Sequence, residues 1–163
     1  MKINVSEQEV LEGLVLANRD MLSLNENMVI SNALADAKRV AVVAMGASGT
    51  EPSICGFVGQ GMADIAVIGN QEAAPGPTQV LKAIQAADRG HGVLLVVMNN
   101  AGDILTSNIV LKEAEKIGII LNDLALTRFD KYAEMLIETN REDKEKLIDE
   151  NLEIDVKSLN EKE

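Results

Sequence analysis

The sequence predicts an α/β fold, a single domain in which a largely parallel sheet is flanked by helices, followed by a charged helical C-terminal tail. Short apolar runs alternate with longer segments of helical periodicity, as in chains whose strands and helices alternate around a buried sheet. Aromatic residues make up only 2% of the chain, so the core must be built from Ala, Val, Ile, Leu and Met. The length of 163 residues fits one domain of this kind.

The first elements are a helix and a polar connector. Ser6 and Glu9 stand at the spacing of a capping box, which predicts a helix that runs to about Asn18. The polar residues 25–27 then read as a connector before an apolar patch at 28–30. One buried stripe is expected on the helix, at Val10, Leu11, Leu14 and Val15.

Three nearly continuous apolar runs predict strands covered on both faces of the sheet. They are residues 39–45, 65–68 and 92–98. A turn at Pro75-Gly76-Pro77 predicts a helix that ends near Arg89-Gly90. A second helix is expected from about Ile104 to Ile117, followed by a further strand at 119–121.

The chain changes character after the last predicted strand. We assign residues 1–122 to the α/β domain and residues 123–163 to a helical, acidic C-terminal extension. Residues 138–163 carry ten acids and five bases, which fits a solvated helix with a frayed end. A surface that docks a partner chain is the alternative for this segment.

Charge and composition limit the classes of partner. Against 15 Lys and Arg stand 26 Asp and Glu, a net charge of -11, which argues against nucleic-acid binding. The sequence has no apolar run of about 18 residues, so we expect a cytoplasmic protein without a membrane partner. Its one cysteine, Cys55, reads as a small buried hydrophobe, and no Cys or His cluster predicts a metal or cofactor.

Two loops are candidates for a binding site. Residues 46–52 follow the first predicted strand, and residues 99–103 follow the third. Ligands of open parallel sheets bind beyond the carboxyl ends of the strands, so these loops are expected to open onto one edge. The first loop lacks the Lys of a P-loop, but its small residues let backbone amides approach a ligand and Ser48 adds a hydroxyl. A plain strand-to-helix connection would use the same residues.

Two ionisable residues are ambiguous by sequence alone. Asp103 reads either as the N-cap of the helix that follows or as an acceptor for a ligand hydroxyl or a general base. His91, the only histidine, precedes a predicted strand and is expected in an exposed loop at the opposite end of the sheet.

Several separate motifs resemble one family in their order and spacing. The motifs are Gly46-Ala47-Ser48-Gly49-Thr50-Glu51-Pro52, Cys55-Gly56-Phe57-Val58-Gly59-Gln60-Gly61-Met62, Pro75-Gly76-Pro77, Asp88-Arg89-Gly90-His91-Gly92-Val93-Leu94-Leu95 and Asn99-Asn100-Ala101-Gly102-Asp103. Together they resemble the substrate-binding subunit of dihydroxyacetone kinases over about residues 6–120, which identifies 1–122 as a dihydroxyacetone-kinase-like domain. The resemblance implies an α/β fold, cytoplasmic glycerol and triose metabolism, and a small ketose or polyol as ligand.

The resemblance also implies five substrate-binding residues. Backbone groups of the family's first loop contact the ligand, and the matching residues here are Ala47, Ser48 and Gly49. Thr50 stands where the family has a histidine that acts in proton transfer and substrate positioning. Asp103 matches an aspartate that hydrogen-bonds the substrate.

Two departures from the family affect catalysis. Met98 stands at the position of a substrate-binding lysine, and a thioether donates no hydrogen bond. No residue matches the histidine that forms a covalent hemiaminal with the ketone in the family, and Thr50 does not titrate near neutral pH. We therefore predict no catalytic residue in this chain and leave its enzymatic status open.

Three functions remain open at the level of sequence. The chain is the N-terminal substrate-binding half of a split kinase or kinase complex, or a non-catalytic metabolite-sensing or regulatory paralogue that pairs with a kinase or regulator. A third hypothesis is an enzyme for a different small acid or sugar that uses Asp103 with partner residues. The expected partners are a second copy in a homodimer and a companion chain that resembles the family's C-terminal half or another kinase subunit.

Overall fold

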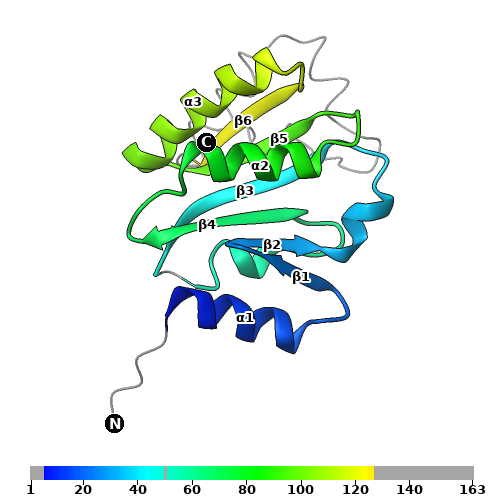
Figure 1. Cartoon of the computed structure of the whole chain (residues 1–163), viewed down its shortest axis with the longest axis vertical. Helices are drawn as coiled ribbons and strands as arrows, with labels where there is room; N and C mark the ends of the chain where they lie inside the picture. The colour runs from blue at the N-terminus through cyan, green and yellow to red at the C-terminus, as the bar shows by residue number, and fades with distance from the viewer. Residues whose placement is uncertain (1–5, 50, 127–163) are drawn as a thin grey trace, which may run out of the picture. The chain divides into compact units, whose positions relative to one another are not determined.

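The computed structural model describes residues 6–49 and 51–126, which fold around one six-stranded sheet (Figure 1). The strand order is β1-β2-β4-β3-β5-β6. The strands are β1 (Leu22–Asn25), β2 (Met28–Ser31), β3 (Ala41–Ser48), β4 (Ile65–Gln71), β5 (Val93–Met98) and β6 (Leu121–Leu126). The helices are α1 (Glu7–Ala17), α2 (Pro77–Ala87) and α3 (Ala101–Lys116), with short 3-10 helices η1 (Asn32–Asp36) and η2 (Cys55–Phe57).

The sheet is mixed, with a parallel majority. β3 pairs in parallel with both β4 and β5, and β5 pairs in parallel with β6. At the other edge β1 and β2 form an antiparallel hairpin, and β2 is antiparallel to β4. The predicted α/β class with a largely parallel sheet flanked by helices is therefore confirmed, and the antiparallel edge is an addition to it.

The hairpin β1–β2 lies where the sequence predicted only a connector and an apolar patch. Its turn is Glu26-Asn27, and Glu26 has a φ of 53°, in the left-handed region. Two-residue hairpin turns usually contain a glycine, because glycine has no Cβ atom and adopts a positive φ without strain. This turn has none, so the usual sequence signal is missing.

The N-terminal helix begins as the sequence predicted. The Ser6 hydroxyl accepts a hydrogen bond from the Glu9 backbone N–H at 3.3 Å, and the Glu9 carboxylate accepts from the Ser6 N–H at 2.8 Å. This reciprocal pair satisfies two of the backbone donors that every helix leaves free at its start. The expected capping box is confirmed.

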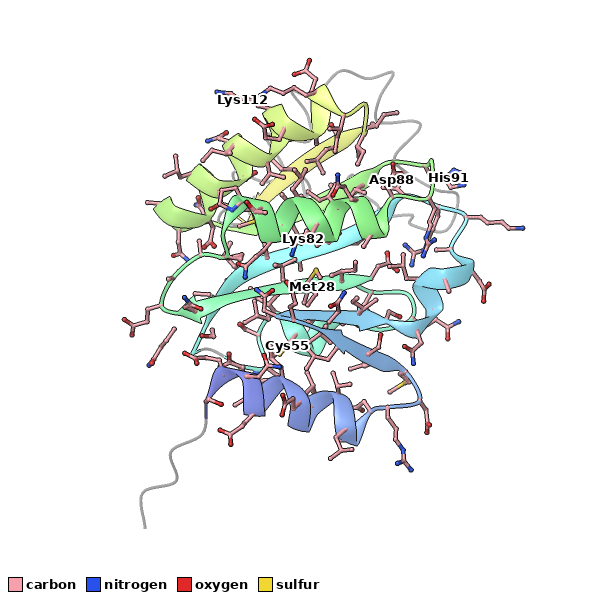
Figure 2. All side chains as sticks on the ribbon, in the orientation of Figure 1. Met28, Cys55, Lys82, Asp88, His91 and Lys112 are labelled. Carbon is pink, nitrogen blue, oxygen red and sulfur yellow. The ribbon has the colours of Figure 1, made fainter. Side chains whose placement is uncertain are left out.

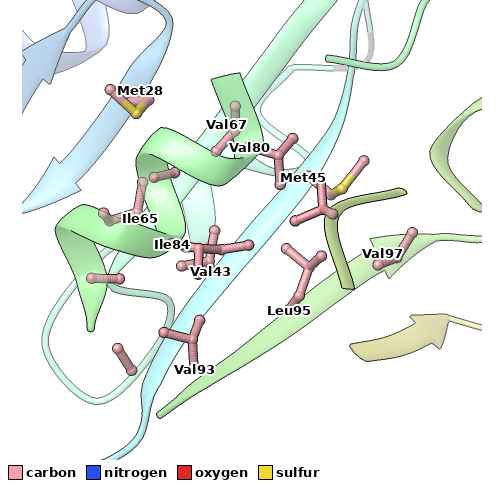
Figure 3. Packing of buried hydrophobic residues seen from close by; sticks show 14 of the residues in the cluster. Met28, Val43, Met45, Ile65, Val67, Val80, Ile84, Val93, Leu95 and Val97 are labelled. Atoms are coloured by element: carbon pink, nitrogen blue, oxygen red, sulfur yellow. The ribbon is translucent and has the colours of Figure 1, made fainter. Parts of the chain in front are cut away.

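One face of the sheet packs against α2 and α3. β3, β4 and β5 supply alternate residues to this face, where Val80 and Ile84 of α2 pack against them (Figure 3). Val110 of α3 belongs to the same cluster. All of the labelled residues in Figure 3 are buried, apolar and non-aromatic, as the low aromatic content requires.

The opposite face packs against α1 and η2. Leu11 of α1 and Cys55 of η2 lie in this second cluster, each 2% exposed. Burial raises the pKa of the Cys55 thiol, and the nearby Glu51 carboxylate adds to this effect. Cys55 is thus a protonated, buried small side chain, as its sequence context predicted.

An ion pair between the buried Asp64 and the exposed Arg39 lies at the amino ends of the central strands. Asp64 is 1% exposed, and both of its oxygens accept hydrogen bonds from the Arg39 guanidinium, at 2.8 and 2.9 Å. The Val42 N–H donates to the same carboxylate at 2.8 Å, while the Asp64 backbone accepts from Ser31 at 2.8 Å. The Asp64 side chain therefore connects the start of β4 to the start of β3, and its backbone carbonyl adds a link to the end of β2.

Part of the predicted organisation lies outside the described residues. β6 runs over Leu121–Leu126, so it begins where the strand expected at 119–121 was to end. Residues 127–163 lie outside the structure's described ranges, so the helical acidic extension and the domain boundary at residue 122 stay predictions.

We expect Asp64→Ala to lower the free energy of unfolding by about 2 kcal/mol, because it leaves the Val42 N–H without its acceptor, whereas the exposed Arg39 guanidinium remains solvated. Urea denaturation followed by circular dichroism measures this change. Glu113→Ala is the matched control, since Glu113 and Lys116 form an exposed ion pair that contributes at most about 0.5 kcal/mol. Equal effects of the two substitutions would contradict a structural role for Asp64.

Candidate functional site

Three loops meet at the carboxyl edge of the parallel strands. β3 ends at Ser48, β4 ends at Gln71 and β5 ends at Met98, and the register pairs Ser48 with Gln71. The loops enclose an open cavity of about 420 Å³ at this edge. Its lining residues come from the ends of β3 and β4 and from the start of α3: Ala47, Ser48, Gly49, Gln71, Glu72, Ala74, Asn100, Gly102 and Asp103.

The loop that follows β4 is held in place by hydrogen bonds to the end of β3 and to α3. The Glu72 N–H donates to the Ser48 carbonyl at 3.2 Å, and the Thr106 hydroxyl of α3 donates to the Pro75 carbonyl at 3.2 Å. The loop also folds back tightly over Gly69, where a Cβ atom would come within 2.1 Å of the Ala73 carbonyl oxygen. Glycine is therefore required there for the loop to reach the cavity.

Two buried polar atoms at the cavity have no hydrogen-bond partner among the described residues. They are Ser48 Oγ and Asp103 Oδ1, and each residue is only 1% exposed. The other Asp103 oxygen accepts from Asn100 Nδ2 at 3.1 Å. Burial raises the pKa of Asp103, and the bond from Asn100 only partly offsets this rise. An unpaired buried carboxylate oxygen is costly, so its presence calls for an explanation.

Asp103 does not cap its helix. α3 begins at Ala101, with Asn100 as the N-cap and no side-chain capping bond, so Asp103 is the third helical residue. The N-cap interpretation of Asp103 is therefore wrong, and the helix starts three residues before the predicted Ile104. The alternative interpretation, an acceptor for a ligand hydroxyl, is compatible with the free oxygen.

Four of the five predicted binding residues lie together at this cavity. Ala47, Ser48, Gly49 and Asp103 all line it, although Gly49 and Asp103 are 54 positions apart in the sequence. Thr50 lies outside the described residues. Gly49 has a φ of 101°, and its N–H donates to both Glu51 carboxylate oxygens at 2.9 and 3.0 Å. The Gly49 amide, expected to face a ligand, is therefore bonded within the loop.

The sequence analysis missed the contribution of the loop after β4. Gln71, Glu72 and Ala74 line the cavity, and so do Asn100 and Gly102 next to Asp103. A signal was available, because Gln71 is a polar residue three positions after the end of the second apolar run, 65–68. Only the pairing of β4 beside β3, which the sequence does not reveal, brings that strand end to the same cavity.

Neither Met98 nor His91 is among the residues that line the cavity. Met98 is half-buried and packs against the second hydrophobic cluster, and its Cγ would be 3.0 Å from a Cβ on Gly46. His91 is exposed, in the loop that precedes β5, next to Asp88 (Figure 2). This is the amino end of the parallel strands, opposite the cavity, as the sequence predicted.

The described residues contain no group of three His, Cys, Asp or Glu side chains that could hold a metal ion. The charged residues that line the cavity are both acidic, Glu72 and Asp103. No helix within the described ranges is long and apolar enough to cross a membrane.

Known proteins share both the sequence and the fold of this region. A PTS-dependent dihydroxyacetone kinase 2, dihydroxyacetone-binding subunit DhaK, from Listeria innocua is 32% identical over 137 residues, 82% of this chain and 41% of the relative. The DhaKLM operon coactivator DhaQ of Lactococcus lactis is 33% identical over 116 residues, 71% of this chain and 35% of the relative. This chain thus spans less than half the length of these relatives.

Solved structures give the same result. The dihydroxyacetone kinase from C. freundii in complex with AMP-PNP and Mg2+ matches with a TM-score of 0.70 at 31% identity, over 76% of this chain and 25% of that one. The co-activator DhaQ matches with a TM-score of 0.69 at 32% identity, over 75% and 38%. A family model described as the Dak1 domain matches residues 12–131, about three quarters of the sequence. The chain therefore belongs to the Dak1 domain family.

Proposed function

We propose that this chain is a dihydroxyacetone-kinase-like substrate-binding protein that holds a small ketose or polyol in the cavity beyond β3, β4 and β5. One observation carries the proposal: the Asp103 carboxylate is buried at the cavity with one oxygen unpaired. A hydroxyl-bearing ligand supplies the missing donor. The relatives named as dihydroxyacetone-binding subunits support this ligand class.

The proposed ligand contacts follow from the groups that line the cavity. Asp103 Oδ1 accepts a hydrogen bond from one ligand hydroxyl, and the Ser48 hydroxyl bonds a second polar group of the ligand. Backbone groups of Ala47 and Gly49 form the adjoining wall, with Thr50 following them in the chain. A short molecule with several hydroxyls is matched to such closely spaced donors and acceptors.

We infer that the chain binds its ligand without phosphorylating it alone. Met98, at the position of the family lysine, packs into the second hydrophobic cluster, and His91 lies at the other end of the sheet. In the split-kinase form of the proposal, a companion chain that resembles the family's C-terminal half, or another kinase subunit, supplies the missing chemistry. We further propose a cytoplasmic homodimer, in keeping with the resemblance.

A regulatory role is the second candidate, favoured by the similarity to the operon coactivator DhaQ. In this form the bound metabolite signals to a kinase or regulator that pairs with the chain. Co-purification separates the two forms. A companion chain that restores phosphoryl transfer supports the split kinase, whereas capture of a transcriptional regulator supports sensing.

We expect Asp103→Asn to weaken dihydroxyacetone binding by roughly tenfold to a hundredfold, the equivalent of one hydrogen bond to a charged group. Isothermal titration of the purified chain at millimolar ligand measures this effect. His91→Ala is the control and leaves the affinity unchanged, because His91 lies at the opposite end of the strands. A larger loss in His91→Ala than in Asp103→Asn would place the ligand at the wrong end of the sheet for this proposal.

Ligand affinity is expected to fall as the pH is lowered. The fall should begin at a higher pH than it would if Asp103 had the pKa of an ordinary aspartate, about 3.9. Protonation of Asp103, whose pKa is raised by burial, removes the charged acceptor. The free energy of unfolding depends on pH in the opposite direction from ligand affinity. Because the folded chain holds this proton more tightly, the Asp103 contribution is fully present below the ordinary pKa and is lost as pH rises through the raised one.

The difference between wild type and Asp103→Asn isolates the contribution of Asp103 to this pH dependence. Thermal unfolding at neutral pH should show Asp103→Asn to be at least as stable as wild type, since it removes a buried charge. A clear loss of stability in Asp103→Asn would show that Asp103 serves the fold rather than a ligand.

A further inference from the structure

We propose that Glu72 is a charge filter, through which the cavity accepts uncharged hydroxyl-bearing ligands and rejects their phosphate esters. This inference rests on the proposed function, because it concerns the ligand of the same cavity. It assigns a specificity role to a residue in the loop after β4, which the resemblance did not single out.

The first step is the charge of the cavity. Among the described lining residues, Glu72 and Asp103 are acidic and none is basic. A third carboxylate, that of Glu51, bonds the Gly49 N–H at the cavity wall. That contact occupies a backbone donor which a phosphate oxygen would otherwise use. An anionic ligand is therefore repelled by the carboxylates, and the Gly49 N–H is not free to bind it.

The second step concerns the start of α3, the one feature of the cavity that attracts anions. The first turn of a helix carries a partial positive charge and free N–H groups. Here Asp103 lies in that first turn and is buried with an unpaired oxygen. Its own negative charge offsets the helix dipole at the point where a phosphate group would bind.

The third step is the fixed position of Glu72. Its backbone N–H bonds the Ser48 carbonyl at 3.2 Å, and its φ of 55° places it in a tight left-handed turn. The pairing of Ser48 with Gln71 sets this turn beside the first loop. This turn places Glu72 among the residues that line the cavity, and solvent partly screens its carboxylate because the residue is exposed.

The test compares dihydroxyacetone with dihydroxyacetone phosphate as calorimetric probes of the same chain. We expect wild type to bind the uncharged ketose at least about tenfold more tightly than the ester. Glu72→Lys should narrow this ratio by about three- to tenfold, the range expected when one exposed charge at a ligand is reversed. Glu72→Gln should narrow it by less.

Glu26→Lys is the matched control. Glu26 is also an exposed glutamate with a left-handed φ, 53°, but it lies in the β1–β2 turn and pairs with Lys82 at 3.4 Å. It should leave the ratio unchanged, and thermal unfolding of each variant checks that it folds. Raising the salt from about 0.05 to 0.5 M should narrow the wild-type ratio, because an electrostatic filter is screened and a steric one is not.

The outcomes separate this inference from the proposed function. If wild type binds the ester as tightly as the ketose, the charge filter is overturned and the proposed function stands. If wild type is selective but Glu72→Lys has no more effect than Glu26→Lys, the role of Glu72 is overturned. Failure of every variant to bind either probe at millimolar concentration would overturn both.

Discussion

The parallel pairing of β3 with β4 on one side and β5 on the other is the constraint on which the site depends. It brings the ends of three strands, and therefore three loops, to one edge of the sheet. The Asp64–Arg39 pair fixes the opposite ends of these strands, so the relative heights of β3 and β4 are set far from the cavity. Residues separated by more than fifty positions in the sequence thereby line one space.

Two aspartates with equal burial show how the chain divides stability from binding. Asp64 and Asp103 are each 1% exposed. Asp64 has a guanidinium and a backbone amide as partners, whereas Asp103 has one amide donor and a free oxygen. The first arrangement compensates the cost of burying a charge, and the second leaves part of it for a ligand to compensate. A buried polar group without a partner lowers stability, and such groups are expected at functional sites.

Sequence reasoning reached the strands with continuous apolar runs, the capping box at Ser6 and the two loops that flank the cavity. It failed where the information is not local. The β1–β2 turn contains no glycine, so its left-handed Glu26 gave no signal. Gln71 and Glu72 join the cavity only through the strand order, and Asp103 looked like an N-cap because the helix start could not be placed within three residues.

Membership of the Dak1 family and the free carboxylate at the cavity lead to one central claim, that a short hydroxylated ligand binds against Asp103. Nuclear magnetic resonance tests it directly, by following backbone amide shifts while dihydroxyacetone is titrated into the labelled chain. The account predicts saturable shifts concentrated at Ser48, Gly49 and Asp103. Shifts concentrated around Gly90 to Gly92, at the opposite end of the parallel strands, would contradict it.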